Sequence, residues 1–158
     1  MAVGICIVGC DVDLATHTVY GPTPEQHMNS LAMMPIGLEF PSGAFELQYR
    51  ASELHDLLDP FAKRNRVTAV LSAETEDGAV VKIVASSEHR LSKAQRLALM
   101  DDEIEAIGYG HAEVTAIDFA EQNNLMPRAI AASSAICKTC GERISSSGVA
   151  RITRLRPE

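Results

Sequence analysis

Two short motifs decide the fold and the chemistry that this chain can support: Gly110-His111-Ala112-Glu113 and Cys137-Lys138-Thr139-Cys140. Together they read His-x-Glu followed by Cys-x-x-Cys. A catalytic zinc ion takes three protein ligands, commonly histidine and cysteine, and keeps its fourth position open. His111, Cys137 and Cys140 therefore predict a zinc site of the catalytic kind. Glu113 lies two positions after the histidine and is not needed as a ligand, so its carboxylate is free to transfer protons.

Both motifs are predicted to lie where helices begin. Cys137 and Cys140 are three positions apart, so on a helix their sulfur atoms point the same way. The first helix is predicted over 111–124, where Pro127 enforces the end, and the second over 137–145. A helix N-terminus and a metal ion both favour the thiolate form of cysteine. Each predicted helix start therefore suits a metal ligand.

Segments around the motifs alternate between helix and strand patterns. Asp77-Gly78 separates two apolar runs and predicts a β-hairpin. A helix that begins at Ser52 precedes the hairpin, with a kink or break at Pro60. Residues 92–106 have the composition of a helix, or of a helix followed by an acidic loop. The predicted strands cover residues 67–71, 79–84, 128–133 and 149–155. This order predicts an α/β fold in which helices pack against a mixed sheet.

The composition is that of an ordinary globular domain, with 46% hydrophobic and 22% charged residues in a chain of 158. A formal net charge of −7 gives no support to strong non-specific binding of nucleic acid. From Cys137 onward, however, basic residues outnumber acidic ones. The basic residues there are Lys138, Arg143, Arg151, Arg154 and Arg156. This end of the chain could contact a nucleic-acid backbone or form a solvated surface.

The first 45 residues are predicted to form an extension packed on a domain that covers 46–158. Strand patterns occur at 3–8 and 15–20, and a short helix is predicted over 25–34. No stretch approaches the roughly 18 apolar residues of a membrane span, so we expect a soluble protein that does not bind membranes. Four cysteines do not make a disulfide scaffold in a chain of this size, and the metal spacing suggests a reducing compartment.

From about Ser52 to Arg156 the sequence resembles the cytidine deaminase-like superfamily, and within it the bacterial toxin-type deaminases. The resemblance rests on His111-Ala112-Glu113-x-x-Ala116-Ile117 followed by the Cys-x-x-Cys motif. It implies a three-layer fold with a sheet of about five strands, and a Zn²⁺ ion held by His111, Cys137 and Cys140. It also implies that Glu113 is the proton shuttle. Ile136 departs from the pattern, because the family usually has proline before the first cysteine.

The resemblance further implies hydrolytic conversion of cytosine to uracil. The substrate is expected to be DNA or another polynucleotide, whose target base is flipped out or already single-stranded. A free nucleoside such as cytidine is the alternative. Candidate substrate contacts are Ser86, His89, Tyr109 and Ser134. A toxin of this kind would act in the cytoplasm of a target cell after secretion. The resemblance then also implies an immunity protein as a partner.

A structural zinc module is the competing interpretation. Cys6 and Cys10 could join Cys137 and Cys140 in a closed four-cysteine site, which would have no position open for catalysis. Cys6 lies in an apolar run, where a buried free thiol is the ordinary state. The residues leave the oligomeric state open.

Overall fold

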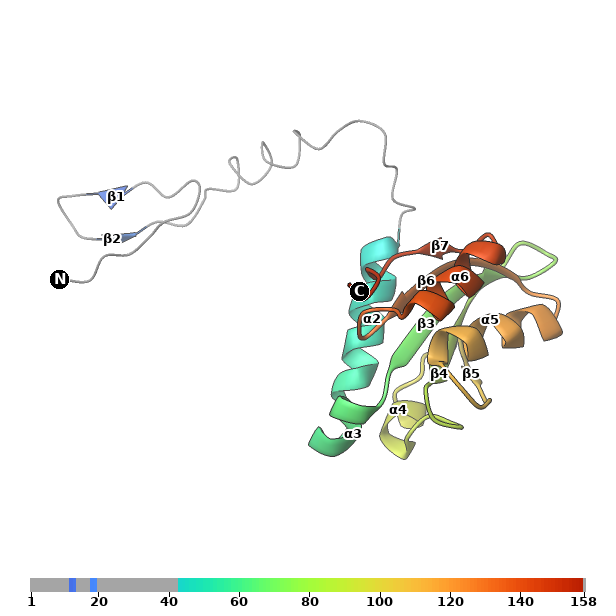
Figure 1. Ribbon diagram of the computed structural model, residues 1–158, viewed down its shortest axis with the longest axis horizontal. Coiled ribbons are helices and arrows are strands. Elements are labelled where there is room, and N and C mark those ends of the chain that lie inside the picture. Colours follow the sequence, from blue (N-terminus) through green and yellow to red (C-terminus); the bar gives the residue numbers. More distant parts are fainter. Residues whose placement is uncertain (1–11, 14–17, 20–42, 158) are drawn as a thin grey trace. The chain divides into compact units, whose positions relative to one another are not determined.

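The computed structural model describes residues 12–13, 18–19 and 43–157 (Figure 1). The chain divides into two compact units, residues 1–39 and 40–158. In the first unit, two short strands, β1 (Val12–Asp13) and β2 (Thr18–Val19), pair in antiparallel fashion. The strand predicted over 3–8, the helix predicted over 25–34, and both Cys6 and Cys10 lie outside the described residues. None of the described helices is long and apolar enough to cross a membrane.

The second unit is built on a five-stranded mixed sheet in the order β5-β4-β3-β6-β7. The strands are β3 (Thr68–Glu74), β4 (Val80–Ser86), β5 (Glu103–Ala106), β6 (Met126–Ala132) and β7 (Ala150–Arg151). The helices are α2 (Ala44–Asp56), α3 (Pro60–Asn65), α4 (Lys93–Leu97), α5 (Ala112–Gln122) and α6 (Lys138–Ser146). β3 runs antiparallel to β4 and β6, whereas the pairs β4/β5 and β6/β7 are parallel. The predicted mixed sheet flanked by helices is confirmed.

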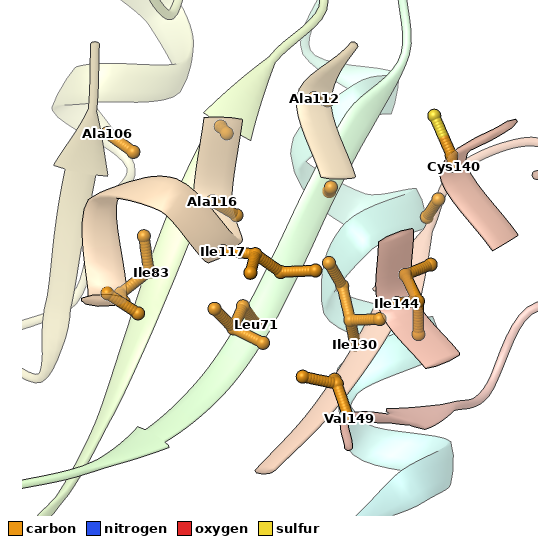
Figure 2. Close-up of a cluster of buried hydrophobic side chains, with 14 of the residues drawn as sticks. Leu71, Ile83, Ala106, Ala112, Ala116, Ile117, Ile130, Cys140, Ile144 and Val149 are labelled. Atoms are coloured by element: carbon orange, nitrogen blue, oxygen red, sulfur yellow. The ribbon is translucent and has the colours of Figure 1, made fainter. Parts of the chain in front are cut away.

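Successive residues of a strand point to opposite faces of the sheet. Both faces are buried here, because each packs against helices. Leu71 and Ile83 belong to the cluster that packs under α5 and α6 (Figure 2). Their neighbours Val70 and Val84 belong to a second cluster, together with Leu47 and other side chains of α2. The domain therefore has three layers, with α2 on one face of the sheet and α5 and α6 on the other.

The predicted hairpin between β3 and β4 is confirmed. Its turn is closed by the Thr75 amide, which donates a hydrogen bond of 2.9 Å to the carbonyl of Ala79. Gly78 has a φ of +85°, a left-handed conformation that glycine adopts without steric cost. The Asp-Gly pair thus appears where a tight turn needs it.

The helix predicted to begin at Ser52 begins earlier, at Ala44, so this prediction was wrong. Ser52 lies inside α2, and its hydroxyl donates a hydrogen bond of 3.0 Å to the carbonyl of Gln48. The buried face of α2 extends back to Leu47, which gives the earlier turns a core to pack on. The break at Pro60 is confirmed: Asp59 caps α3 by accepting hydrogen bonds from two backbone amides, and Pro60 occupies the first turn.

Of the two alternatives for residues 92–106, one continuous helix was wrong. A short helix, α4, is followed by an acidic segment, as the other alternative has it, but that segment leads into the strand β5. Ser92 caps α4 in a reciprocal capping box with Gln95. β5 then pairs in parallel with β4, and Glu103 is held by the buried Arg50 of α2. The last predicted strand is also shorter than expected. β7 covers two residues, and further along the chain Leu155 forms an isolated parallel bridge with Ile136.

Candidate metal centre

Both motifs begin helices, as predicted. His111 is the N-cap residue of α5, and Cys137 is the N-cap residue of α6. The Cys137 sulfur accepts a hydrogen bond of 3.4 Å from the amide of Cys140, so it caps the first turn. The imidazole of His111 makes no capping hydrogen bond, and its Nδ1 instead lies within hydrogen-bond distance of the Cys137 sulfur. β6 connects the two helices and places their N-termini at the same end of the sheet (Figure 1).

Two glycines shape the approach to His111. Gly110 has a φ of +122°, which a residue with a side chain adopts only under strain. Gly108 lies so close to α5 that an added Cβ would come within 2.8 Å of the Thr115 side chain. The chain can therefore pass tightly over the first turn of α5 and turn into the helix at His111.

The three predicted ligands lie together. One ligand atom from each of His111, Cys137 and Cys140 lies within 4.8 Å of the other two. Nδ1 of His111 is 3.6 Å from the sulfur of Cys137. A zinc ion with ordinary Zn–S and Zn–N bond lengths in a tetrahedron separates such atoms by about 3.6 Å. The thiols of Cys137 and Cys140 are free rather than joined in a disulfide. The residues therefore fit a metal ion, and two sulfurs with one imidazole nitrogen are a zinc-like donor set.

The site is anchored on one side and open on the other. Cys140 is only 1% exposed and belongs to the buried cluster shown in Figure 2. His111, by contrast, is exposed. Burial raises the pKa of the Cys140 thiol, and its hydrogen bond with Cys137 and the negative charge of Glu113 act in the same direction. A metal cation reverses this effect, because a coordinating thiol loses its proton.

Glu113 lies in the first turn of α5 and is 4% exposed. It lines a pocket of about 450 Å³ together with two of the candidate metal ligands, His111 and Cys137. The other lining residues are Asn65, Val67, Ser87, Gly110, Ala135 and Arg156. The volume falls within the roughly 300–1,000 Å³ typical of small-ligand sites. A buried carboxylate thus faces the same space as the metal-binding side chains.

None of the four predicted substrate contacts is among the lining residues of this pocket. Ser86, Tyr109 and Ser134 each adjoin a lining residue in sequence, and Tyr109 lines a separate pocket beside α5. Ser86 is buried, and its hydroxyl accepts a hydrogen bond from the amide of Glu88, while its neighbour Ser87 lines the pocket. The rings of His89 and Tyr109 stack on each other with centroids 4.3 Å apart, and both residues are exposed. Ser134 is half-buried next to Ala135.

Among the lining residues that were not predicted as site residues, Asn65 and Arg156 have the largest polar side chains. Asn65 ends α3, and nothing in its local sequence separates it from an ordinary helix-end asparagine. Arg156 belongs to the basic C-terminal stretch, which is a visible signal, but its position beside the metal centre depends on tertiary pairing.

Zinc analysis of the purified chain should find about one ion per molecule. We expect His111→Ala and Cys140→Ser each to lower zinc content strongly, because each removes one of three ligands. The control is Cys6→Ala, which should retain zinc. Loss of zinc in Cys6→Ala together with retention in His111→Ala would instead support the structural four-cysteine module.

These assignments rest on the geometry of the site and on the sequence motifs. A scan against protein-family models found no match, and a search of the curated proteins found none either.

Proposed function

We propose that this chain is a zinc-dependent hydrolytic deaminase that converts cytosine to uracil in DNA or another polynucleotide. The observation that supports this proposal best is the proximity of a zinc-like ligand set and a buried carboxylate. A zinc-like set of ligand atoms lies within 4.8 Å, and the buried carboxylate of Glu113 lines the same pocket as two of the ligands. This is the set of groups that a metal-assisted hydrolysis requires.

In the proposed mechanism, His111, Cys137 and Cys140 would hold a zinc ion, which would supply a Lewis acid able to bring the pKa of a water molecule towards 7. Glu113 accepts a proton from the attacking water at a carboxylate oxygen. The same carboxylate delivers that proton to the ring nitrogen of the base as the water oxygen bonds to the ring carbon. It then takes the second proton from the added hydroxyl group and passes it to the amine, so that the C–N bond breaks and ammonia leaves. Burial of Glu113 keeps bulk water from competing for these protons.

The proposed polynucleotide substrate has two lines of support beyond the sequence resemblance. The basic C-terminal stretch reaches the pocket at Arg156. Tyr109 is 87% exposed, stacks on His89, and directly precedes Gly110 of the pocket lining, so its ring offers a surface for a neighbouring base. Ser86 and Ser134 stay proposals as substrate contacts, since both adjoin lining residues.

Free cytidine or a nucleotide is the second candidate substrate. It is favoured by the net charge of −7 and by a pocket whose volume suits one small ligand. The toxin-type resemblance adds the proposal that the domain is secreted, acts in the cytoplasm of a target cell, and has an immunity protein as its partner.

The proposal is tested by incubating the zinc-loaded protein with single-stranded DNA, duplex DNA, RNA and cytidine, followed by a uracil assay. We expect uracil to form in at least one polynucleotide at a rate well above that of the zinc-free protein. Conversion of cytidine alone would show that the substrate is the free nucleoside and not a polynucleotide. Absence of uracil in all four samples, with zinc bound, would contradict the deaminase proposal.

A further inference from the structure

Arg156 is the only lysine or arginine that lines the pocket at the metal centre within the part of the chain that the structure describes. Its side chain is exposed, and it makes no ion pair with a carboxylate of residues 43–157. The acidic residue of the lining, Glu113, is 4% exposed. The pocket lining therefore combines a buried carboxylate with an exposed guanidinium group with which no carboxylate of residues 43–157 pairs.

Main-chain pairing sets the position of Arg156. The Arg156 amide donates a hydrogen bond of 2.7 Å to the carbonyl of Ile136, and the Ile136 amide donates one of 3.0 Å to the carbonyl of Arg154. Ile136 directly precedes Cys137. A proline at position 136 could not donate the bond to Arg154. The carbonyl of a proline could still accept the bond from Arg156, so the isoleucine found where the resemblance leads us to expect proline adds the second bond, to Arg154.

Side-chain packing holds the same segment from the other side. Leu155 lies against α6 at Gly141, where an added Cβ would come within 2.6 Å of the leucine Cδ2. Glycine at this position lets the C-terminal segment approach the helix closely. Arg156 thus projects from a backbone that two hydrogen bonds and one close contact fix in place.

We infer that Arg156 binds a phosphate group of the substrate, so that the pocket takes phosphate-bearing nucleosides in preference to uncharged ones. This inference rests on the proposed function and narrows its substrate class. A guanidinium group matches the geometry of phosphate oxygens and forms charge-assisted hydrogen bonds with them. Because the chain carries a net charge of −7, a phosphate is attracted only where a cation is exposed locally. A free nucleotide and a polynucleotide both present this group.

The test compares Arg156→Gln with Arg154→Gln in the zinc-loaded full chain. Arg154 is also exposed and carries the same charge, but it does not line the pocket, so it controls for net charge. Dissociation constants are measured by calorimetry for cytidine and cytidine monophosphate, and by fluorescence anisotropy for a labelled single-stranded oligonucleotide with one cytosine. The oligonucleotide titration is repeated at several salt concentrations.

For Arg156→Gln we expect about tenfold weaker binding of the phosphate-bearing probes, with cytidine unchanged. The dependence of log K on log salt for the oligonucleotide should become shallower by about 0.7, the value for one lost phosphate contact on a single strand. Arg154→Gln should change neither quantity. A defect with the monophosphate alone identifies a terminal phosphate as the ligand, and a defect with the oligonucleotide alone identifies a phosphodiester.

Three results would overturn the inference. They are an equal loss of affinity for cytidine in Arg156→Gln, an equal loss of phosphate-probe affinity in Arg154→Gln, and no binding of any phosphate-bearing probe to the wild-type protein. A uracil assay on the same samples separates it from the proposed function. Wild-type protein that binds phosphate through Arg156 but never forms uracil keeps the phosphate site and refutes the deaminase. If wild-type protein forms uracil while Arg156→Gln binds the probes and reacts normally, the deaminase proposal is kept and the phosphate site at Arg156 is refuted.

Discussion

Replacing Glu113 with glutamine is expected to lower the rate of cytosine deamination by roughly 10²–10⁴-fold, the usual contribution of a general acid–base residue. Glutamine has nearly the same shape but cannot accept and return a proton at neutral pH. Glu113 is 4% exposed inside the pocket, and no other described carboxylate lines that pocket to take its place. The measurement is the initial rate of uracil formation with saturating substrate.

Zinc content separates a chemical effect from a structural one. Glu113 is not one of the three clustered ligands, so Glu113→Gln should retain about one zinc ion per chain and a normal unfolding temperature. Glu142→Gln is the matched control, since Glu142 is an exposed carboxylate on α6 outside this pocket. Its rate should stay at the wild-type level. Activity that survives Glu113→Gln would remove Glu113 from the mechanism.

Replacing Arg50 with leucine is expected to lower the free energy of unfolding by about 3–5 kcal/mol, because it leaves a buried carboxylate without its partner. Arg50 and Glu103 form two parallel hydrogen bonds of 2.7 Å. Their side chains are 7% and 0% exposed. Arg50 also donates a hydrogen bond to the carbonyl of Ala98, so it joins α2 to the segment that leads into β5. Urea denaturation measures the change.

An exposed pair provides the control. Arg128 and Glu74 also form two hydrogen bonds, but their side chains are 52% and 35% exposed. Arg128→Leu should cost no more than about 1 kcal/mol, because water and salt screen such a pair. The double variant Arg50→Leu/Glu103→Leu should recover part of the loss, since it leaves no unpaired charge. A loss equal to that of Arg128→Leu would show that burial does not decide the strength of the Arg50 pair.

Local signals predicted much of the domain. The Asp77-Gly78 turn, the break at Pro60 and the helix starts at His111 and Cys137 each depend on a few neighbouring residues, and each is confirmed. The start of α2 and the strand β5 were missed because they depend on contacts distant in sequence. Leu47 packs on the sheet, and Glu103 is stabilised in its strand by Arg50, which lies 53 positions away.

By itself, the sequence predicted the candidate ligand set and singled out Glu113, because residue type and a spacing of three on a helix are local properties. Only the tertiary structure decided that His111 lies 3.6 Å from Cys137, since β6 must first bring two helix ends together. Only the tertiary structure placed Arg156 beside the same pocket, through backbone pairing with Ile136. Short-range geometry therefore specifies which groups are present, and long-range pairing specifies which of them face each other.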